Sequence, residues 1–252
     1  MSSSALTAYA EAFTARHRTP DRPSLHGPAM YGAPPDEDGA AVRLLITDDR
    51  AHDQLTDLLP TVRAGRIDAF SEAPRCIDLI HHQLGWPSKP STAMACPDLR
   101  TVPDLPLAGE LAVHPVRRLE DDAPEGLLLD DAVAVAMTAD PTIDEPAAVL
   151  AGYLRSLPRA FRLFAAVDGA GVARATSGVG IFGHQAAVLF VNTEPDWRRR
   201  GIGRSMTALA LRAARAAGAR SAALDSSEAG SSIYKGLGFE SVTRTLRFSG
   251  PL

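Results

Sequence analysis

The chain has 252 residues, 45% of them hydrophobic and 22% charged, so it can bury the core of one large domain or of two small ones. Its formal net charge of -4 gives no overall attraction to nucleic acid or to an anionic membrane, and argues against partners of either kind. Its two cysteines show no metal-ligand spacing and no disulfide pattern, which favours a reducing, cytoplasmic location.

The amino terminus, residues 1–28, is rich in Ser, Pro and charge and predicts a tail or a short packing helix. It lacks the charged start and apolar core of an export signal. No later stretch approaches the roughly 18 consecutive apolar residues that a membrane span needs. We therefore expect neither export nor a membrane span.

Residues 29–107 predict a small α/β amino-terminal domain, followed by a linker in the Pro-rich run TVPDLPLAG at residues 101–109. Its predicted elements, in chain order, are a strand at about 41–47, helices at about 51–64 and 73–84, and a strand at about 91–96.

Residues 108–252 predict a second domain in which strands and helices alternate, with a hairpin turned by Asp168 and Gly169. Its predicted strands lie at about 110–116, 161–167, 172–181, 188–191, 221–225 and 241–248, and its predicted helices at about 124–139, 145–156, 202–217 and 229–237.

The most informative segment is VLFVNTEPDWRRRGIGRS, residues 188–205, in which a strand is followed by three arginines, two glycines and an amphipathic helix. Gly201 and Gly203 let the backbone approach a bound group, while the unpaired N–H groups and the dipole of the helix favour negative charge. The segment therefore predicts a phosphate or pyrophosphate site. The ordinary alternative is a basic turn before an amphipathic helix; a dinucleotide fold would need a third glycine and a later acidic residue.

A second motif, SSIYKGLGFE, places Tyr234 on a short helix just before a turn at Gly238 and Phe239. The glycine turn, the strand that ends in Asp225, and this motif together resemble the GNAT superfamily of acyl-CoA dependent N-acyltransferases. The resemblance covers about residues 110–250. It implies an α/β fold with a central, mixed, splayed sheet flanked by helices, preceded here by the small α/β domain.

The resemblance also implies how acetyl-CoA binds. Backbone groups of Val191 and Thr193 at the splay would hydrogen-bond the pantetheine arm as if it were a strand. Ser227, at a place where many members of the family have asparagine, and Ser232 are minor candidates for contact with the cofactor, whereas Trp197 is expected to pack. The pyrophosphate would be held by the segment formed by Arg198, Arg199, Arg200, Gly201, Ile202, Gly203, Arg204 and Ser205.

Tyr234 matches the position that usually lies beside the coenzyme sulfur in this family, so we expect its phenol to protonate the departing thiolate as a general acid. The alternative is that it only packs and hydrogen-bonds the cofactor. The family's occasional glutamate base has no counterpart here, because the matching stretch is Ala186, Ala187 and Val188. The remaining candidates for a general base are Glu194, Asp225, Glu228 and His184, each of which has an ordinary interpretation as a turn residue or a helix cap.

The amino-terminal domain has a fainter likeness to the same family in IHHQLGWPSKPSTAM, with Leu84, Gly85, Trp86 and Met94 at the corresponding turn and strand. It has no glycine-arginine segment. Two interpretations stay open: a degenerate acetyltransferase-like half, or an unrelated extension that shapes the acceptor pocket or a homodimer contact. Under either, we do not expect this domain to bind acetyl-CoA.

The leading hypothesis is an acetyl-CoA dependent N-acetyltransferase that acts by direct attack of an amine on the thioester, without a metal or a covalent enzyme intermediate. The alternative from another class is a noncatalytic acyl-CoA binding sensor or partner-binding module. A protein acetyltransferase comes third, and nucleic-acid binding through the arginines a distant fourth. The amine acceptor, the preferred acyl group and the oligomeric state are not specified by the sequence.

Overall fold

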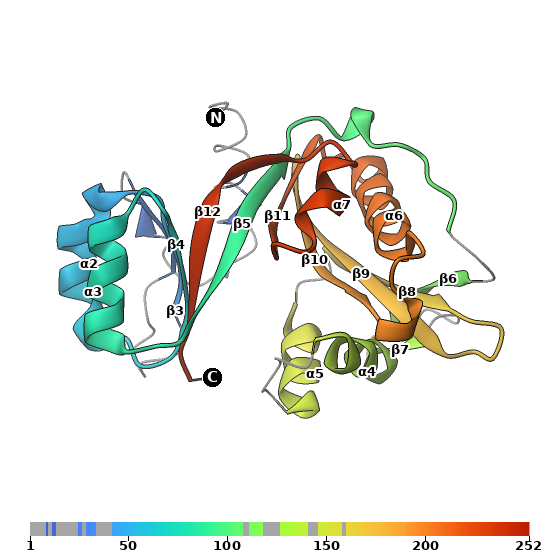
Figure 1. Ribbon diagram of the computed structural model, residues 1–252, viewed down its shortest axis with the longest axis horizontal. Helices are drawn as coiled ribbons and strands as arrows, with labels where there is room; N and C mark the ends of the chain where they lie inside the picture. Colours follow the sequence, from blue (N-terminus) through green and yellow to red (C-terminus); the bar gives the residue numbers. More distant parts are fainter. Residues whose placement is uncertain are drawn as a thin grey trace. The chain divides into compact units, whose positions relative to one another are not determined.

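The computed structural model describes residues 9, 12–13, 25–26, 29–33, 42–107, 111–117, 127–140, 146–157 and 160–251. The chain forms two compact units, and neither is a single stretch of sequence (Figure 1). The first unit consists of Met1–Ala95, Ala223–Ser232 and Phe239–Leu252, and the second of Cys96–Ala222 and Ile233–Gly238.

The sheet of the first unit is mixed, and the last strand of the chain lies inside it. β3 (Val42–Ile46) and β4 (Gly65–Phe70) are parallel. β12 (Glu240–Ser249) pairs antiparallel with β4 on one side and with β5 (Ser88–Cys96) on the other. The strand order is β1-β2-β3-β4-β12-β5, in which β1 (Leu25–His26) and β2 (Met30–Ala33) form one edge.

Two helices lie along one face of this sheet (Figure 1). α2 (His52–Leu58) is flanked by the 3-10 turns η1 (Asp49–Ala51) and η2 (Leu59–Thr61). α3 (Pro74–Leu84) begins at a proline, whose missing N–H has no helical partner to lose there, and ends at Gly85 with φ 61°. Cys76 and Ile80, one turn apart on α3, are buried in the core of this unit.

The sheet of the second unit has the order β10-β9-β8-β6-β7. Neighbouring strands are antiparallel except β6 and β7. The bounds are β6 (Ala112–Arg117), β7 (Leu127–Leu128), β8 (Phe161–Val167), β9 (Ala173–Phe182) and β10 (Gln185–Thr193). The hairpin between β8 and β9 is turned by Asp168, whose carboxylate accepts the backbone N–H groups of Ala170 and Val172.

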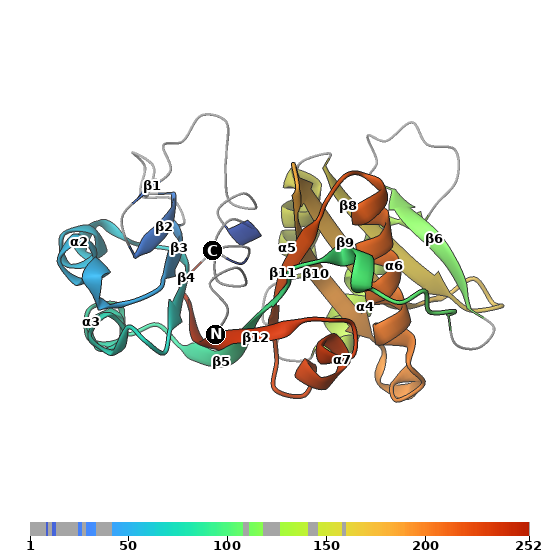
Figure 2. The same ribbon diagram turned by 90° about the horizontal axis from the view of Figure 1, so that it is seen from above.

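Helices cover both faces of this second sheet (Figures 1 and 2). α4 (Leu129–Ala139) and α5 (Ala147–Ser156) pack together against one face, in a cluster that includes Phe161 and Leu163. α6 (Ile202–Ala216) packs against the other through Ile202 and Met206. β11 (Ser221–Ser226) starts in the second unit and ends in the first, and α7 (Ser231–Lys235) starts in the first and ends in the second.

Most predicted elements are confirmed within a few residues. The helix predicted at about 51–64 is shorter, because Pro60 cannot donate an N–H and the chain tightens into a 3-10 turn there. The helix predicted at about 124–139 begins at Leu129: residues 124–126 lie outside the described residues, and residues 127–128 form the short strand β7 instead. The sequence prediction thus omitted β1, β2, β4 and β7.

β4 was missed because its sequence, GRIDAF, begins with a glycine and carries two charged residues. Arg66 and Asp68 share one face of the strand, and Asp68 is 0% exposed. These charges are neutralised by partners that come from distant parts of the chain. Hydrophobic alternation cannot reveal a strand of this kind.

The compact units differ from the sequential domains predicted at residues 1–28, 29–107 and 108–252, since the first unit also takes in β12 and part of β11. The predicted linker at 101–109 belongs to the second unit as far as Leu107, and Pro106 accepts a hydrogen bond from Ser205 there. Residues 108 and 109 lie outside the described residues, as does most of 1–28. Tyr9, Ala12 and Phe13 are described, helical and buried in a cluster of the first unit.

Candidate functional site

The predicted anion-binding segment joins β10 to α6 in the second unit. After the 3-10 turn η4 (Pro195–Trp197), Arg199 has φ 64° and Gly201 has φ 78°. The first backbone bond of α6 runs from Ser205 N to Gly201 O at 3.0 Å. The N–H groups of the residues before Ser205 therefore have no acceptor inside the helix, and they and the dipole favour an anion at this end.

β10 is interrupted by a bulge shortly before this turn. Leu189 pairs with Gly178 of β9 and Asn192 with Thr176, so Phe190 and Val191 together face Ser177 alone. Phe190 has φ 54°, a left-handed backbone conformation. The ladder with β9 pairs neither Phe190 nor Val191, so the bulge redirects their backbone groups.

In the described part of the chain, Phe190 and Arg199 are the only residues other than glycine with positive φ. A left-handed conformation costs a residue with a side chain about 1–2 kcal/mol, and such residues gather at functional sites. Both of these lie within residues 188–205, the segment that the sequence singled out. The strain and the predicted site thus coincide.

The arginine side chains of the segment hold its backbone in place. Arg198 donates through Nε to Thr193 O at 3.1 Å and through Nη2 to Ala139 O. Arg200 donates to Asp196 O at 3.0 Å and lies 4.9 Å from the ring centre of Trp197, which packs as expected. Arg204 donates to Gly236 O at 2.9 Å, a bond between α6 and the turn after Tyr234.

The remaining residues of the segment differ in what they offer a ligand. A Cβ placed on Gly203 would lie 3.6 Å from Thr193 Oγ1, so the start of α6 and the end of β10 meet where this glycine has no side chain. Ile202 is buried in the core beneath α6. Ser205 has its N–H bonded within the helix and its hydroxyl donated to Pro106 O at 2.8 Å.

Tyr234 lies on α7 in the second unit, and its carbonyl accepts the N–H of Leu237 at 2.9 Å. The side chain is partly exposed. Burial of the phenol disfavours its charged form and raises the pKa to about 12. The group is therefore a neutral hydrogen-bond donor at physiological pH.

The other predicted residues are placed less centrally. Ser227 belongs to the first unit, in an exposed turn where its hydroxyl accepts the N–H of Gly230 at 3.3 Å. Three of the candidate bases have ordinary environments. Glu194 pairs with Arg174 at 2.8 Å, Glu228 is exposed in a turn, and His184 Nδ1 contacts Gly218 O at 3.2 Å.

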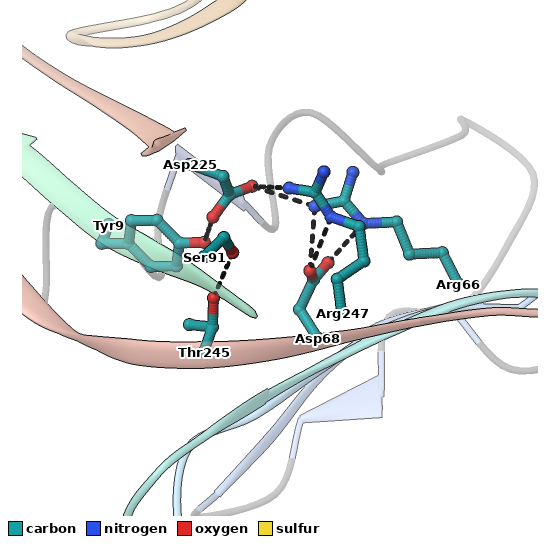
Figure 3. A network of polar contacts seen from close by, with 7 residues as sticks. All are labelled: Tyr9, Arg66, Asp68, Ser91, Asp225, Thr245 and Arg247. Atoms are coloured by element: carbon teal, nitrogen blue, oxygen red, sulfur yellow. Dashed lines mark hydrogen bonds and ion pairs between the residues drawn. The ribbon is translucent and has the colours of Figure 1, made fainter. Parts of the chain in front are cut away.

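Asp225, the fourth candidate base, is part of a charged network in the first unit (Figure 3). Tyr9 donates its hydroxyl to Oδ1 of Asp225, and Arg66 donates to Oδ2 at 2.9 Å. Arg247 approaches the same Oδ2 at 3.3 Å. A carboxylate with both oxygens engaged in this way is a poor proton acceptor, so the structure argues against Asp225 as the base.

The same network accounts for the two charged residues of β4. The buried carboxylate of Asp68 accepts Nε of Arg66 at 2.6 Å and Nε of Arg247 at 3.3 Å (Figure 3). The attraction of the two aspartates outweighs the burial of the Arg66 guanidinium and raises its pKa. Two arginines and two aspartates thus balance one another, with Tyr9 bonded to Asp225 at one end of the network (Figure 3).

One strand-to-helix junction of each unit can be compared for charge. In the first unit, β3 leads to α2 through Asp48 and Asp49, and Asp48 caps the turn by accepting the N–H of Arg50 at 3.0 Å. In the second unit, arginines and glycines occupy the corresponding place between β10 and α6. An anion suits the second junction and is repelled by the first.

Among the described residues, no group of three or more His, Cys, Asp or Glu side chains could hold a metal ion. Nor does any helix in the described part of the chain have the length and apolar character needed to cross a membrane.

The fold is shared with known acetyltransferase structures. A GCN5-related N-acetyltransferase from Kribbella flavida matches with a TM-score of 0.63 at 18% identity, over 100% of this chain and 97% of that one. One from Sphaerobacter thermophilus matches with a TM-score of 0.55 at 14% identity, over 89% and 79%. A GCN5-related N-acetyltransferase-like protein from Streptococcus suis matches with a TM-score of 0.55 at 15% identity, over 88% and 84%.

The model of the acetyltransferase (GNAT) family matches residues 128–239. That stretch includes β10, α6 and Tyr234. The chain therefore carries a domain of the GNAT acetyltransferase family, and the resemblance seen in its motifs is confirmed. No curated protein sequence was found to match it.

Sequence reasoning located the segment at residues 188–205 but missed the bulge within it. The residues that accompany the bulge, Thr176, Ser177 and Asn192, are small or polar residues in strands and belong to no motif. The available signal was weak: a run of Thr, Ser and Gly in the middle of β9, opposite a strand of larger residues.

Proposed function

We propose that this protein transfers an acetyl group from acetyl-CoA to an amine by direct attack of the amine on the thioester. The observation that carries the proposal is the conjunction, within residues 188–205, of a strand bulge with a left-handed turn that opens a helix. When bound, acetyl-CoA supplies a thioester: the amine nitrogen bonds to its carbonyl carbon, the C–S bond breaks, the nitrogen loses a proton, and the thiolate takes one up.

The residues at the start of α6 suit the pyrophosphate. Their backbone N–H groups precede the first helical bond, and Gly203 leaves open the space beside Thr193. Arg198, Arg199, Arg200 and Arg204 add positive charge. Because both donors of Ser205 have partners within the protein, we assign the phosphate contacts to the residues before it.

The end of β10 suits the pantetheine arm and the thioester. At the bulge β10 departs from its regular ladder with β9, and a backbone redirected in this way suits hydrogen bonds to an extended ligand lying along the strand. We assign the arm to the backbone of Val191 and Thr193. We also assign the Val191 N–H to polarise the thioester carbonyl at the bulge.

Tyr234 is assigned to the leaving sulfur. A phenol with a pKa of about 12 stays protonated over the range in which an enzyme is assayed, so it always has a hydrogen to donate. It stabilises a thiolate by this hydrogen bond and passes its proton to the sulfur as the C–S bond breaks, and the phenolate then takes up the proton that the amine releases. A separate general base is not assigned.

Calorimetric binding of acetyl-CoA, together with thiol release across a panel of amines, tests the proposed function. We expect saturable binding and turnover with at least one class of amine. Absence of cofactor binding contradicts the proposal as a whole. Binding without turnover on any amine supports the noncatalytic acyl-CoA binding module instead.

Replacing Tyr234 tests its assigned role. Tyr234→Phe removes only the hydroxyl, and we expect kcat to fall about 100-fold, as on loss of a general acid, with acetyl-CoA affinity nearly unchanged. Thiol release and calorimetry measure the two effects. Tyr31→Phe in the first unit is the matched control and should change neither. Full turnover in Tyr234→Phe would show that the tyrosine only packs.

A further inference from the structure

A short relay of hydrogen bonds joins β9 to the bulge of β10. Asn192 donates through Nδ2 to Thr176 Oγ1 at 3.4 Å, and Thr176 donates its hydroxyl to Phe190 O at 2.9 Å. Thr176 is 1% exposed, so water does not compete for its hydroxyl. The relay ends on the carbonyl of the residue whose backbone is left-handed.

The relay fixes the direction of the peptide group that links Phe190 to Val191. The carbonyl of Phe190 and the N–H of Val191 belong to the same planar unit, so holding one determines where the other points. The ring of Phe190 meets that of Phe161 edge to face, with centres 6.1 Å apart, and holds the side chain of the strained residue. The hydroxyl of Thr176 holds its main chain.

We propose that Thr176 is a positioning residue, whose hydroxyl orients the Val191 N–H toward the reacting carbonyl by holding Phe190 in its left-handed conformation. This inference rests on the proposed function, since only a bound thioester gives the Val191 N–H a carbonyl to polarise. A donor aimed in advance at developing charge stabilises a transition state more than a ground state. Loss of the Thr176 hydroxyl therefore affects turnover more than cofactor binding.

The next residue in the strand supplies a matched control. Ser177 faces the opposite side of β9 from Thr176, and in the described structure its buried hydroxyl has no hydrogen-bond partner. Ser177→Ala thus removes a hydroxyl at the same depth and beside the same bulge, but outside the relay.

The experiment compares Thr176→Val, Thr176→Ser and Ser177→Ala with the wild-type protein. Valine keeps the shape of threonine without its hydroxyl, and serine keeps the hydroxyl. We expect kcat to fall about tenfold in Thr176→Val, less than the 100-fold or more that follows complete removal of such a donor. Thr176→Ser should have a kcat close to that of the wild type, and Ser177→Ala should have the same kcat as the wild type. Affinity for coenzyme A should be similar in all four proteins.

Hydrogen exchange in the ligand-free proteins gives a readout that does not depend on catalysis. The amides of residues 190–192 should exchange faster in Thr176→Val and at wild-type rates in Thr176→Ser and Ser177→Ala. Thermal unfolding checks that each variant folds, and the serine variant keeps the test decisive if the valine variant does not fold.

Three outcomes overturn the inference. The first is that Thr176→Val folds and has the kcat and the amide exchange of the wild type. The second is that Ser177→Ala loses as much kcat as Thr176→Val does. The third is that Thr176→Ser does not restore kcat. If the wild type binds no acetyl-CoA, the proposed function is contradicted. The structural role of Thr176 is then tested by hydrogen exchange alone, and unchanged exchange in Thr176→Val contradicts that role as well.

Discussion

Gly203 shows how the absence of one side chain prepares a binding site. A methyl group there would lie 3.6 Å from Thr193 Oγ1, an ordinary contact distance, so the fold accepts alanine. We expect Gly203→Ala to keep or raise stability, by up to about 1 kcal/mol, because glycine is a poor helix former. The methyl occupies the space assigned to the pyrophosphate, so acetyl-CoA affinity should fall on the order of tenfold.

Calorimetry with acetyl-CoA and thermal unfolding together check this prediction. Gly152→Ala is the control for the helix-forming effect: it lies in the middle of α5, where no described atom outside the helix's own backbone lies within 4 Å of the added methyl. It should gain similar stability and bind acetyl-CoA as the wild type does. If Gly203→Ala binds acetyl-CoA with wild-type affinity, the pyrophosphate does not lie beside this glycine.

Cys76 makes stability depend on pH in the alkaline range. Burial, and then the nearby negative charge of Asp49, raise the pKa of its thiol from 9.0 to about 12. The unfolded chain therefore loses this proton at lower pH than the folded one. The contribution of the protonated Cys76 thiol to the free energy of unfolding is fully present below about pH 9 and is lost as the pH rises towards 12.

Urea unfolding between pH 8 and about 10.5 measures this dependence. The free energy of unfolding should fall by at most about 1.4 kcal/mol per pH unit from this one group. Cys76→Ala lowers stability at all pH values but removes that part of the slope. An identical slope in the variant shows that other groups are responsible.

Residue identity alone predicts part of the proposed site. Arg198, Gly201, Gly203 and Tyr234 stand in local motifs, and local motifs can be found in a sequence. Phe190 has no such signature, because its left-handed conformation is imposed by Thr176 on the neighbouring strand and by Phe161. A conformation enforced by tertiary contacts against the preference of the residue cannot be derived from local sequence.

At the scale of elements, β4 depends on a polar network rather than on alternating hydrophobic residues. Arg66→Ala removes the guanidinium that bonds both Asp68 and Asp225 and leaves two buried carboxylates to Arg247. We expect it to destabilise the protein by about 3–5 kcal/mol, the usual cost of breaking a buried ion pair from one side.

Arg50→Ala is the control for this variant. Arg50 pairs with Asp48 at 2.7 Å, but its side chain is 66% exposed, and such exposed pairs contribute little to stability. Urea unfolding of both variants gives the comparison. A loss in Arg66→Ala as small as that in Arg50→Ala would show that the network adds little to stability.

The elements that the sequence predicted well have strong local signals. α3 has a proline at its start and a glycine at its end, and α6 has a clear apolar face. β4 and the short edge strands β1 and β2 have no comparable signal. They become strands because of neighbours that arrive from elsewhere in the chain.

At the scale of the whole molecule, the last strand has a structural role in the first unit. β12 pairs with both β4 and β5, so removing it leaves a gap inside that sheet. A chain that stops after Phe239 should lose the folded first unit as well as its own missing strand. Hydrogen exchange of β4 and β5 in the truncated chain measures this loss, and protection at full-length levels would contradict the prediction.

The boundary predicted between two sequential domains could not anticipate this arrangement. The signals used were a Pro-rich run and changes in composition, which report on local chain properties. The pairing of β12 with strands more than 140 residues earlier is a long-range choice. The local composition of residues 101–109 carries no information about this long-range pairing.

A growing chain leaves the ribosome from its amino terminus, and domains are usually able to fold in that order. Here β3, β4 and β5 emerge early, but the strand that belongs between β4 and β5 is synthesised more than 140 residues after β5. The first unit therefore cannot complete its sheet while the second unit is being synthesised. Until β12 emerges, β4 and β5 lack the strand that pairs with both of them in the folded protein.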